Sequence, residues 1–546
     1  MIAGDKTAPD EHKGPQLDSM HVGDIRGALG TIRRSDTGPR LGVWRKLATF
    51  LAIVGPGLIV MVGDNDAGAF GTYTQAGQNY GTALMWTLLL LVPVLYVNQE
   101  MVLRLGVVSG VGHARLILER FGKFWGAFSV IDLFLLNALT IVTEFIGISL
   151  ALKFLGLPNL AGVAISAVLV MLAASTGSFR RFERFAVTLS LGSLLLVPIL
   201  FYVHAPVARS LHDFFIPGFP KGGNVGDVML LIVAIVGTTV APWQLFFQQS
   251  YVIDKRITPR FLNYERWDLI VGIGFVMLGA IAMMSFTAQA FAGRPEFGNF
   301  QDAGAVAAGL ALYAGKVPGV LFAVGLLDAS ILGAAAVSLS TAYAVGDVLS
   351  FRHSLHRKVT DAPVFYAVYL GLIAVAAAVV LVPGSPLGLL TNAVQTLAGV
   401  LLPSATVFLL LLSNDKPVLG PFANKQGTNV FTGVVIAVLV VLSLILVSAV
   451  LFPSMGMKQV LWILLSGSAL TLAGAAWIAI VKPQSEGEHG PGSADPTTWR
   501  MPPLDELPRA QLTPLSRVCL VGLRGYLIVA VVLVVVRVGE MVVRKG

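Results

Sequence analysis

The stretch Val62-Gly63-Asp64-Asn65-Asp66-Ala67-Gly68-Ala69 decides how this chain is interpreted. It interrupts an apolar segment that begins near Leu47 (LATFLAIVGPGLIVMV) and otherwise has the composition of a membrane-spanning helix. Ionisable side chains are costly at membrane depth, so Asp64 and Asp66 are expected to face an internal cavity that water reaches. The flanking glycines favour a locally unwound backbone whose carbonyl groups become available as ligands. The stretch therefore predicts a cation site in the middle of a bilayer.

The composition of the whole chain indicates a polytopic helical membrane protein. Of its 546 residues, 55% are hydrophobic and only 12% are charged, whereas soluble domains carry about 25% charged residues. The formal net charge of +8 does not point to nucleic acid as a partner, because the basic residues gather in alternate loops as membrane topology requires. The single cysteine, Cys519, excludes an internal disulfide and a cysteine-rich metal site. Residues 1–46 hold no apolar run typical of a cleaved signal peptide, so the first span is expected to direct insertion.

The apolar segments predict twelve membrane spans, each close to the roughly 20 residues that a spanning helix needs. After the first span they cover residues 82–103, 125–152, 160–174, 185–203, 228–250, 269–291, 317–349, 362–382, 387–412, 430–451 and 460–481. A thirteenth apolar segment, 518–536, follows a polar, Pro-rich linker and contains Arg524. It either spans the membrane or lies at its surface, and spanning is the favoured interpretation.

The distribution of Lys and Arg among the loops predicts the orientation. The N-terminal tail and every second loop are rich in Lys and Arg, and the opposite loops hold only scattered basic residues. The positive-inside rule then places the N-terminus in the cytoplasm. The basic residues on that side are Arg33, Arg34, Arg40, Arg45, Lys46, Arg115, Arg120, Lys123, Arg180, Arg181, Arg184, Lys255, Arg256, Arg260, Arg352, Arg357 and Lys358. We expect an integral protein of a bacterial cytoplasmic membrane; the sequence leaves its oligomeric state open, with a monomer as one option.

Two interrupted helices predict an internal repeat. The first span breaks at Gly63–Ala69, and the sixth has a comparable interruption at Gly237–Gln244 that contains Pro242. Paired broken helices in inverted repeats mark the midplane binding site of many transporters, and their freed backbone groups must line a cavity or meet protein. The predicted organisation is a cytoplasmic tail (1–46), repeat unit 1 (47–204), repeat unit 2 (227–413), helices 11 and 12 (427–482), a cytoplasmic linker (483–516) and a final segment with the additional helix (517–546).

Five motifs carry a resemblance to a known family. They are GPGLIVMVG (55–63), RLGVVSG (104–110), GSFRRFE (177–183), APWQ (241–244) and SND (413–415). Over about residues 45–480 the chain resembles the NRAMP family of divalent-metal transporters. The resemblance implies an all-α, LeuT-like inverted repeat of two five-helix units, in which the metal binds between unwound helices 1 and 6, with additional C-terminal helices.

The chain departs from the family pattern at the ligands. The family's Asp-Pro-Gly-Asn motif on helix 1 aligns with Asp66-Ala67-Gly68-Ala69, so the aspartate is kept and the asparagine is replaced by Ala69. The family's Met-Pro-His on helix 6 aligns with Ala241-Pro242-Trp243, so the metal-binding methionine is absent. On helix 3 only the glutamate of an Asp-x-x-Glu proton pathway remains, as Glu144. A second family histidine falls near Gln248, and the family's helix 10 glutamine matches Gln395.

These departures predict a hard cation as the substrate. Without a thioether, the ligands are carboxylate, amide, carbonyl and water oxygens, a set that suits Mg²⁺, Ca²⁺ or Mn²⁺. Two alanines also enlarge the pocket, as a partly hydrated Mg²⁺ would need. The loss of the methionine resembles the NRAMP-related magnesium transporters. Because Glu144 alone is a poor proton relay, uncoupled uptake driven by the membrane potential is expected, with no resident cofactor.

The candidate site residues each have a structural alternative. Asp66 is expected to bind the ion directly, or else to cap the half-helix after the break, and Asp64 is either an accessory ligand or a solvated acid of the vestibule. Glu144 is a remnant of a proton path or a buried, hydrogen-bonded acid. The other candidates are the carbonyl groups of Ala67, Gly237 and Ala241, the side chains of Gln244, Gln248 and Gln395, and Ala69 and Trp243 as pocket wall or gate.

Three rival functions remain open at this point. One is a proton-coupled Mn²⁺/Fe²⁺ importer, which Cd²⁺ uptake would reveal because Cd²⁺ prefers soft ligands. Another is a carrier of an organic solute, although two aspartates at the break would repel a carboxylate there. The third is a metal sensor that does not transport, with residues 483–546 as its output. An enzyme is not supported, since the acids and the few histidines have no zinc-type spacing.

Overall fold

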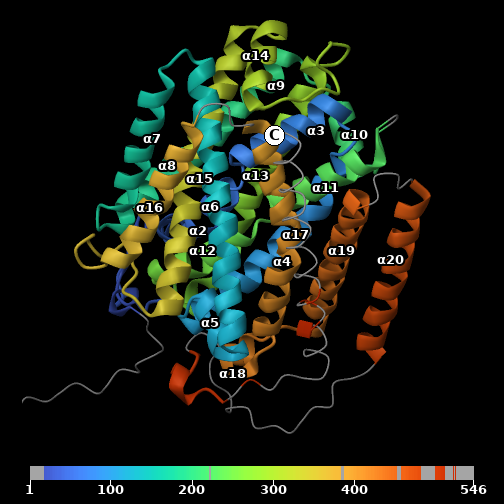
Figure 1. Ribbon diagram of the computed structural model, residues 1–546. Helices are drawn as coiled ribbons and strands as arrows, with labels where there is room; N and C mark the ends of the chain where they lie inside the picture. The colour runs from blue at the N-terminus through green and yellow to red at the C-terminus, as the bar shows by residue number, and fades with distance from the viewer. Residues whose placement is uncertain are drawn as a thin grey trace, which may run out of the picture.

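The computed structural model is a bundle of long helices, most of which run in a common direction (Figure 1). It describes residues 18–220, 223–382, 387–451, 457–480 and 499–508, with a few single positions up to residue 525. Helices are the expected solution for an apolar chain in lipid, because every backbone N–H and C=O must be satisfied inside the segment. The all-α polytopic fold predicted from composition is confirmed.

The first half of the chain forms ten α-helices, of which the first three are pieces of one interrupted span. They are α1 (Val43–Ile53), α2 (Pro56–Val62), α3 (Ala67–Tyr80), α4 (Trp86–Ser109), α5 (His113–Phe121), α6 (Lys123–Phe154), α7 (Asn159–Ala174), α8 (Phe179–Ser190), α9 (Leu196–Val203) and α10 (Val207–Phe215). A 3-10 helix, η2 (Leu191–Leu195), joins α8 to α9.

The second half repeats this plan, beginning with a second interrupted span. Its helices are α11 (Val225–Thr239), α12 (Pro242–Asp254), α13 (Leu262–Ala290), α14 (Ala303–Tyr313), α15 (Lys316–Leu349), α16 (Pro363–Val380) and α17 (Leu387–Ser413), with η3 (Pro259–Phe261) before α13. Beyond them lie α18 (Lys416–Leu419), η4 (Gly420–Phe422), α19 (Gln426–Leu451), α20 (Met457–Ile480) and η5 (Leu504–Glu506).

The broken spans lie in the centre of the bundle and the C-terminal helices at its side. Helix α13 packs against α2 and α3, α11 against α17, α12 against α4 and α15, and α15 along α6. Helix α19 packs on α17, and α20 lies outside α19 (Figure 1). Each of the twelve predicted spans coincides with one helix or with two or three consecutive helical segments. The predicted thirteenth, 518–536, lies outside the described residues except for single positions, and the boundaries of the repeat units stay a prediction.

Length and hydropathy support a membrane location. Nine helical segments within the described residues are long and apolar enough to cross a membrane. A tenth results if α1 and α2, which are bent by 53° relative to each other, form one span. That bend at Val54–Gly55 is an additional kink in the first span, and the sequence analysis did not predict it.

Part of the N-terminal tail is folded, a feature that the sequence analysis did not address. Residues Ser19–His21 form η1, and the strands β1 (Ile25–Arg26) and β2 (Thr31–Ile32) pair antiparallel, with Ile25 opposite Ile32. Ile25 and Ile32 are buried in a small apolar cluster together with residues of α1 and α4. We call residues 18–32 the N-terminal hairpin; it is docked because its two isoleucines cover the end of the first span.

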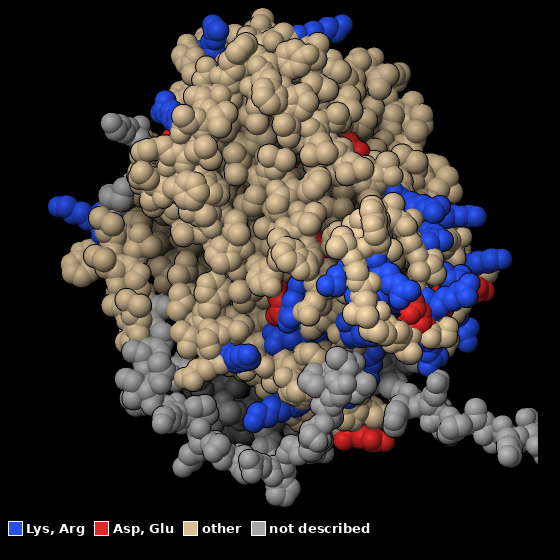
Figure 2. Space-filling model, turned by 180° about the vertical axis from the view of Figure 1, so that it is seen from behind, with Lys and Arg blue, Asp and Glu red and all other residues tan. Residues whose placement is uncertain are grey.

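The charged side chains are distributed unevenly over the surface. Lys and Arg gather on the end of the molecule that carries the N-terminal hairpin, while the middle of the bundle is largely without charge (Figure 2). We call this end the basic face. It includes the start of α8, the turn after α12 and the loop between α15 and α16. The opposite end carries α14 and α10 (Figure 1).

Candidate functional site

Two breaks, one in each half of the chain, create the candidate site. In the first span, α2 ends at Val62 and α3 begins at Ala67, so four residues (63–66) are not helical. In the second, α11 ends at Thr239 and α12 begins at Pro242. Proline at the first helical position removes a donor that would have no intrahelical partner there. Both breaks were predicted, and both are shorter than the sequence ranges suggested.

Asp66 caps the half-helix that follows the first break. Its backbone is extended, and its Oδ1 accepts a hydrogen bond of 2.9 Å from the N–H of Ala69. The residue is 3% exposed. Asp66 therefore has the capping role that was considered as its structural alternative. It engages one carboxylate oxygen with a backbone donor and is compatible with ion binding through the other.

Asp64 is buried without a conventional partner. It is 1% exposed, and no hydrogen bond of normal geometry from the described residues reaches either carboxylate oxygen. It lies near Asp66 and the amide of Gln244. A buried carboxylate that is neither paired nor hydrogen-bonded is strongly destabilising. Asp64 is therefore buried beside Asp66 and is not a solvated acid of the vestibule; its role as a ligand stays a prediction.

Helix α12 presents polar groups that also lack partners. The Oε1 of Gln244 accepts a hydrogen bond of 2.9 Å from Nε2 of Gln99 on α4, while the Nε2 of Gln244 has no partner among the described residues. Both polar atoms of Gln248, one turn further along, are buried and unpartnered. Buried amides are normally hydrogen-bonded to protein or to water. This edge of the site therefore has the capacity to hold ordered water.

Trp243 closes the site from the side of the second break. Its indole Nε1 is buried and unpartnered, and its carbonyl accepts a hydrogen bond of 2.9 Å from Ser340 on α15. A Cβ added to Gly63 would lie 3.4 Å from the Trp243 ring, so the ring lies against the first break. The predicted role of Trp243 as a wall fits this position.

Helix α17 supplies a third wall through Gln395. A Cβ added to Gly68 would come within 1.7 Å of the Gln395 Nε2, so the amide occupies the space that only glycine leaves open there. A Cβ added to Gly237 on α11 would lie 2.3 Å from the backbone carbonyl oxygen of Gln395. Gln395 thus touches the residues that follow the first break and the last turn of α11, and it is 3% exposed.

The candidate carbonyl ligands differ in their availability. Gly237 is in the last turn of α11, where carbonyl groups lose their intrahelical donors. The carbonyl of Ala241 accepts a bond of 3.2 Å from the N–H of Gln244. Ala67 is the first residue of α3, so its carbonyl is directed along that helix. The backbone geometry therefore leaves the carbonyl of Gly237 more available than those of Ala241 and Ala67, which are engaged at the starts of α12 and α3. Ala69 is fully buried and adds no polar side chain.

Glu144 on α6 lies directly behind the first break. Its Oε2 accepts a hydrogen bond of 3.1 Å from the N–H of Ala67, and its Oε1 has no partner among the described residues. Gly333 on α15 approaches so closely that an added Cβ would be 2.8 Å from the Glu144 carboxyl carbon and 3.1 Å from the Asp66 Cβ. Glu144 therefore has at least a structural role, because it holds the start of α3.

Asp64, Asp66 and Glu144 form a buried acidic group without a basic partner. No Lys, Arg or His of the described residues forms an ion pair with any of them; the ion pairs found there involve other acids. They do not converge into a cage of their own, since the described residues hold no cluster of three or more His, Cys, Asp or Glu with metal-binding geometry. A cation here would be shared among carboxylate, amide, carbonyl and water oxygens.

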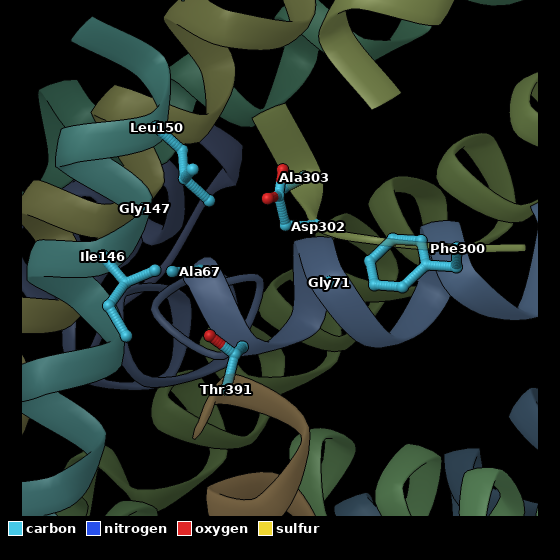
Figure 3. Close-up of a pocket in the computed structure, with 9 residues that line it drawn as sticks. All are labelled: Ala67, Gly71, Ile146, Gly147, Leu150, Phe300, Asp302, Ala303 and Thr391. Atoms are coloured by element: carbon cyan, nitrogen blue, oxygen red, sulfur yellow. The ribbon is translucent and has the colours of Figure 1, made fainter. Parts of the chain in front are cut away.

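A small cavity lies between the start of α3, directly after the first break, and the start of α14. Its volume is about 10 Å³, roughly room for one water molecule. Figure 3 shows the Asp302 carboxylate between the helix of Leu150 and the helix of Gly71, with Ala67 at the inner end. Asp302 caps α14 by accepting a bond of 2.8 Å from Ala305. The sequence analysis missed Asp302; an acid just before an alanine-rich helix was the available signal.

On the opposite side of the breaks, a cluster of buried charged side chains surrounds the kink between α1 and α2. The Nζ of Lys255 donates to the carbonyls of Ile53 and Val54 and lies 2.7 Å from Oε1 of Glu183. Asp268 on α13 accepts bonds from the N–H groups at the start of α2, the shortest being 2.7 Å from Gly57. The kink between α1 and α2 is thus held at both ends by fully buried charges.

Comparisons with known proteins identify the family of this chain. The family model "Natural resistance-associated macrophage protein-like" (Nramp) matches residues 57–449. A protein named divalent metal cation transporter MntH from Ralstonia nicotianae is 30% identical over 434 residues, which cover 76% of this chain and 93% of the relative. A protein of the same name from Deinococcus radiodurans is 27% identical over 460 residues, covering 81% and 97%.

A solved structure supports the fold. The crystal structure of the Eremococcus coleocola manganese transporter superimposes with a TM-score of 0.62, covering 84% of this chain and 98% of that protein at 22% sequence identity. At this identity the likeness establishes the architecture and not the substrate. The relatives are named as transporters and not as enzymes. From the extent of the family match and the shared fold, the chain belongs to the Nramp family.

Proposed function

We propose that this protein transports a divalent metal cation across a membrane by alternating access, through the site between the two broken helices. The observation that carries the proposal is the unpartnered carboxylate of Asp64 next to Asp66, both buried where α2 ends and α3 begins. A cation is the partner that such a pair of acids lacks. The names of the relatives, divalent metal cation transporters, point to the same class of substrate.

Mg²⁺ is the proposed substrate, and Mn²⁺ also fits. The side chains around the breaks offer carboxylate and amide groups, and the position of the family's methionine is Ala241. Mg²⁺ is held through few carboxylates and keeps several of its waters. The unpartnered amide groups of Gln244 and Gln248 are suited to bind those waters. Without sulfur, the site gives no advantage to soft ions such as Cd²⁺.

Transport is proposed to occur without proton coupling. Glu144 is the single acid behind the break, and its Oε2 is engaged with the backbone of Ala67. No histidine lies on α11 or α12. A divalent ion that moves down a 100 mV inside-negative potential gains about 4.6 kcal/mol, twice the roughly 2.3 kcal/mol per charge. This is enough for accumulation without a second ion.

The proposed orientation places the basic face in the cytoplasm, in agreement with the positive-inside rule. The small cavity at Asp302 then lies toward the outside, and the cluster of buried charged side chains around Lys255 lies toward the inside. A bacterial cytoplasmic membrane remains the proposed location. The runner-up function is a proton-coupled Mn²⁺/Fe²⁺ importer, favoured by the manganese transporter with the same fold.

The test is ion influx into proteoliposomes that contain a Mg²⁺ indicator and a pH indicator. We expect Mg²⁺ and Mn²⁺ influx that responds to an inside-negative potential, is lost in Asp66→Ala, and leaves the internal pH unchanged. Acidification of the vesicle interior in step with metal influx would refute the uncoupled mechanism and favour the proton-coupled importer. Strong Cd²⁺ influx with little Mg²⁺ influx would refute the proposed selectivity. Absence of any metal influx with the wild-type protein would favour the alternative of a metal sensor that does not transport.

A further inference from the structure

A cavity on the basic face lies apart from the metal site, where four segments distant in sequence meet. Its volume is about 320 Å³. Its walls include Arg26 of the N-terminal hairpin, Ser178 and Arg180 at the start of α8, Arg256 in the turn after α12, and His356 in the loop before α16. We call it the arginine pocket.

Backbone carbonyls hold two of the arginines in place. The Nε of Arg180 donates to the carbonyl of Gly27 at 2.8 Å and one Nη to that of Gly30 at 2.8 Å. The Nε of Arg256 donates to Met20 at 2.8 Å, and its Nη1 donates to Asp24 O at 3.2 Å. Carbonyls orient a guanidinium without cancelling its charge. Each of these side chains keeps one terminal nitrogen without a partner among the described residues.

The third arginine, Arg26, has few contacts with the rest of the protein. The side chain of Arg26 is 60% exposed, and its nearest acid, Asp24, lies 3.8 Å away. The other acid near Arg256 is Asp254, whose carboxylate accepts bonds from Tyr343, Ser354 and the N–H of Leu355. The pocket therefore holds three guanidinium groups against two nearby carboxylates, Asp24 and Asp254, which leaves an excess of positive charge.

The start of α8 adds donors to the same pocket. Ser178 is the N-cap residue but forms no capping hydrogen bond with its side chain. A helix N-terminus carries a partial positive charge and free N–H groups, which favour anions. His356 lies on Phe179 with the rings nearly parallel, at 5.3 Å between centroids, and forms a wall beside this end. These groups reinforce the arginines.

We propose that the arginine pocket binds a phosphate group, supplied either by a small soluble phosphorylated ligand or by the headgroup of an anionic lipid. Guanidinium forks match phosphate oxygens in geometry and charge. The cavity volume lies at the lower end of the range for small-molecule sites, which fits a phosphate or diphosphate group. The bound group would join the N-terminal hairpin to α8 and to the turn after α12.

The joining of these three segments gives the site a consequence for transport. The hairpin covers the end of α1, and Glu183 of α8 accepts a hydrogen bond from its Ala28 N–H. A ligand that bridges Arg26 to Arg180 and Arg256 therefore stabilises the closed basic face. In the proposed orientation this is the cytoplasmic side, so the ligand would act as an inhibitor from within.

The experiment measures binding directly, so that its result does not depend on transport activity. Full-length protein in phosphatidylcholine nanodiscs, free of divalent cations, is titrated with inorganic pyrophosphate and followed by calorimetry and thermal unfolding. The variant is Arg26→Gln, which removes an exposed charge with one weak contact. The matched control is Arg33→Gln, an exposed arginine of the same tail outside the pocket. A second arm replaces about one third of the lipid by phosphatidylglycerol.

A soluble ligand predicts pyrophosphate binding that Arg26→Gln weakens by about five- to tenfold, the range for loss of one exposed charge-assisted hydrogen bond, while Arg33→Gln retains it. A lipid ligand predicts instead that phosphatidylglycerol raises the unfolding temperature of the wild type and of Arg33→Gln more than that of Arg26→Gln. If neither probe has an effect, or if both variants respond alike, the pocket does not bind phosphate.

Discussion

The two roles of Asp66 can be separated by two substitutions at the same position. In the structure its carboxylate caps α3 through the N–H of Ala69, and we propose that it also binds the ion. Asparagine keeps a side-chain oxygen that can accept the capping bond but removes the charge, whereas alanine removes both. Asn and Asp are about equally good N-cap residues, and replacement of either by Ala costs about 1 kcal/mol of stability. Asp66→Ala should therefore be less stable than Asp66→Asn by about 1 kcal/mol.

The loss of ion affinity should be large and equal in both variants. Two unit charges about 4 Å apart interact by about 4 kcal/mol at an effective dielectric constant of about 20, so a divalent ion would gain about 8 kcal/mol from Asp66. Retained waters and the desolvation of the carboxylate offset much of this. A net loss of about 3 kcal/mol, or more than 100-fold in affinity, is the expected scale.

The assay combines Mg²⁺ influx with thermal unfolding in the absence of divalent ions. We expect Asp66→Asn to abolish influx at Mg²⁺ concentrations that saturate the wild type, with an unfolding midpoint close to that of the wild type. Asn224 provides the control, since its side chain caps α11 by accepting a bond of 2.8 Å from Gly226 at the outer end of that helix. Asn224→Ala should lose stability but keep influx. If Asp66→Asn transports Mg²⁺ normally, Asp66 is a cap and nothing more.

Three further predictions concern selectivity, the kink and pH. Ala241→Met should raise Cd²⁺ influx relative to Mg²⁺ influx because it restores a soft ligand. Overpacking by the larger side chain should cost about 1–3 kcal/mol of stability. An unchanged ratio of the two influx rates would place Ala241 away from the ion. Lys255→Met should destabilise the protein by about 3–5 kcal/mol because it leaves the carboxylate of Glu183 buried and unpaired, and Glu183→Gln should restore part of the unfolding midpoint in the double variant. Burial alone would lower the pKa of His353, but the adjacent carboxylate of Asp347, 2.9 Å away, raises this pKa to about 9. The protonated pair therefore stabilises the fold fully below about pH 6.5, and this contribution, about 3 kcal/mol, is lost as the pH rises through about 9. Thermal unfolding between pH 7 and 10 should show this loss in the wild type and not in His353→Gln.

The fold was largely accessible from the sequence because the chemistry of the bilayer restricts the choices. Long apolar segments must be helices, and the two interruptions stood out because glycine, proline and aspartate are rare together inside such segments. The Nramp motifs then gave the architecture. Asp66, Gln244 and Gln395 are all buried, and Gln395 lies against Gly68 and Gly237, but that they share one ion site stays a prediction based on the two breaks of an inverted repeat.

The features that the sequence did not reveal depend on contacts between distant residues. Lys255 and Glu183 are 72 positions apart and look like ordinary loop charges, yet both are fully buried at the kink. The N-terminal hairpin is short and polar, and it is docked through Ile25 and Ile32 against a surface formed only after folding. Asp302 belongs to a loop that covers the breaks only in the folded protein. Periodicity and composition are local properties of the sequence, so they contain no information about contacts between distant residues.

The arrangement of half-helix ends bears on how the proposed site would attract a divalent ion without holding it too tightly. Each helix end contributes about half a charge, positive at N-termini and negative at C-termini, so the ends of α2 and α11 attract a cation and the starts of α3 and α12 repel it. Asp66 masks the start of α3, whereas Ala241 leaves the start of α12 without a side-chain cap. Counted without side chains, the two negative and two positive helix ends nearly cancel, so the net attraction proposed for a cation comes from the carboxylates of Asp64 and Asp66. A carrier has to release what it binds. A site in which two acids act on an ion that keeps part of its water meets that requirement, whereas a closed cage of carboxylates would not.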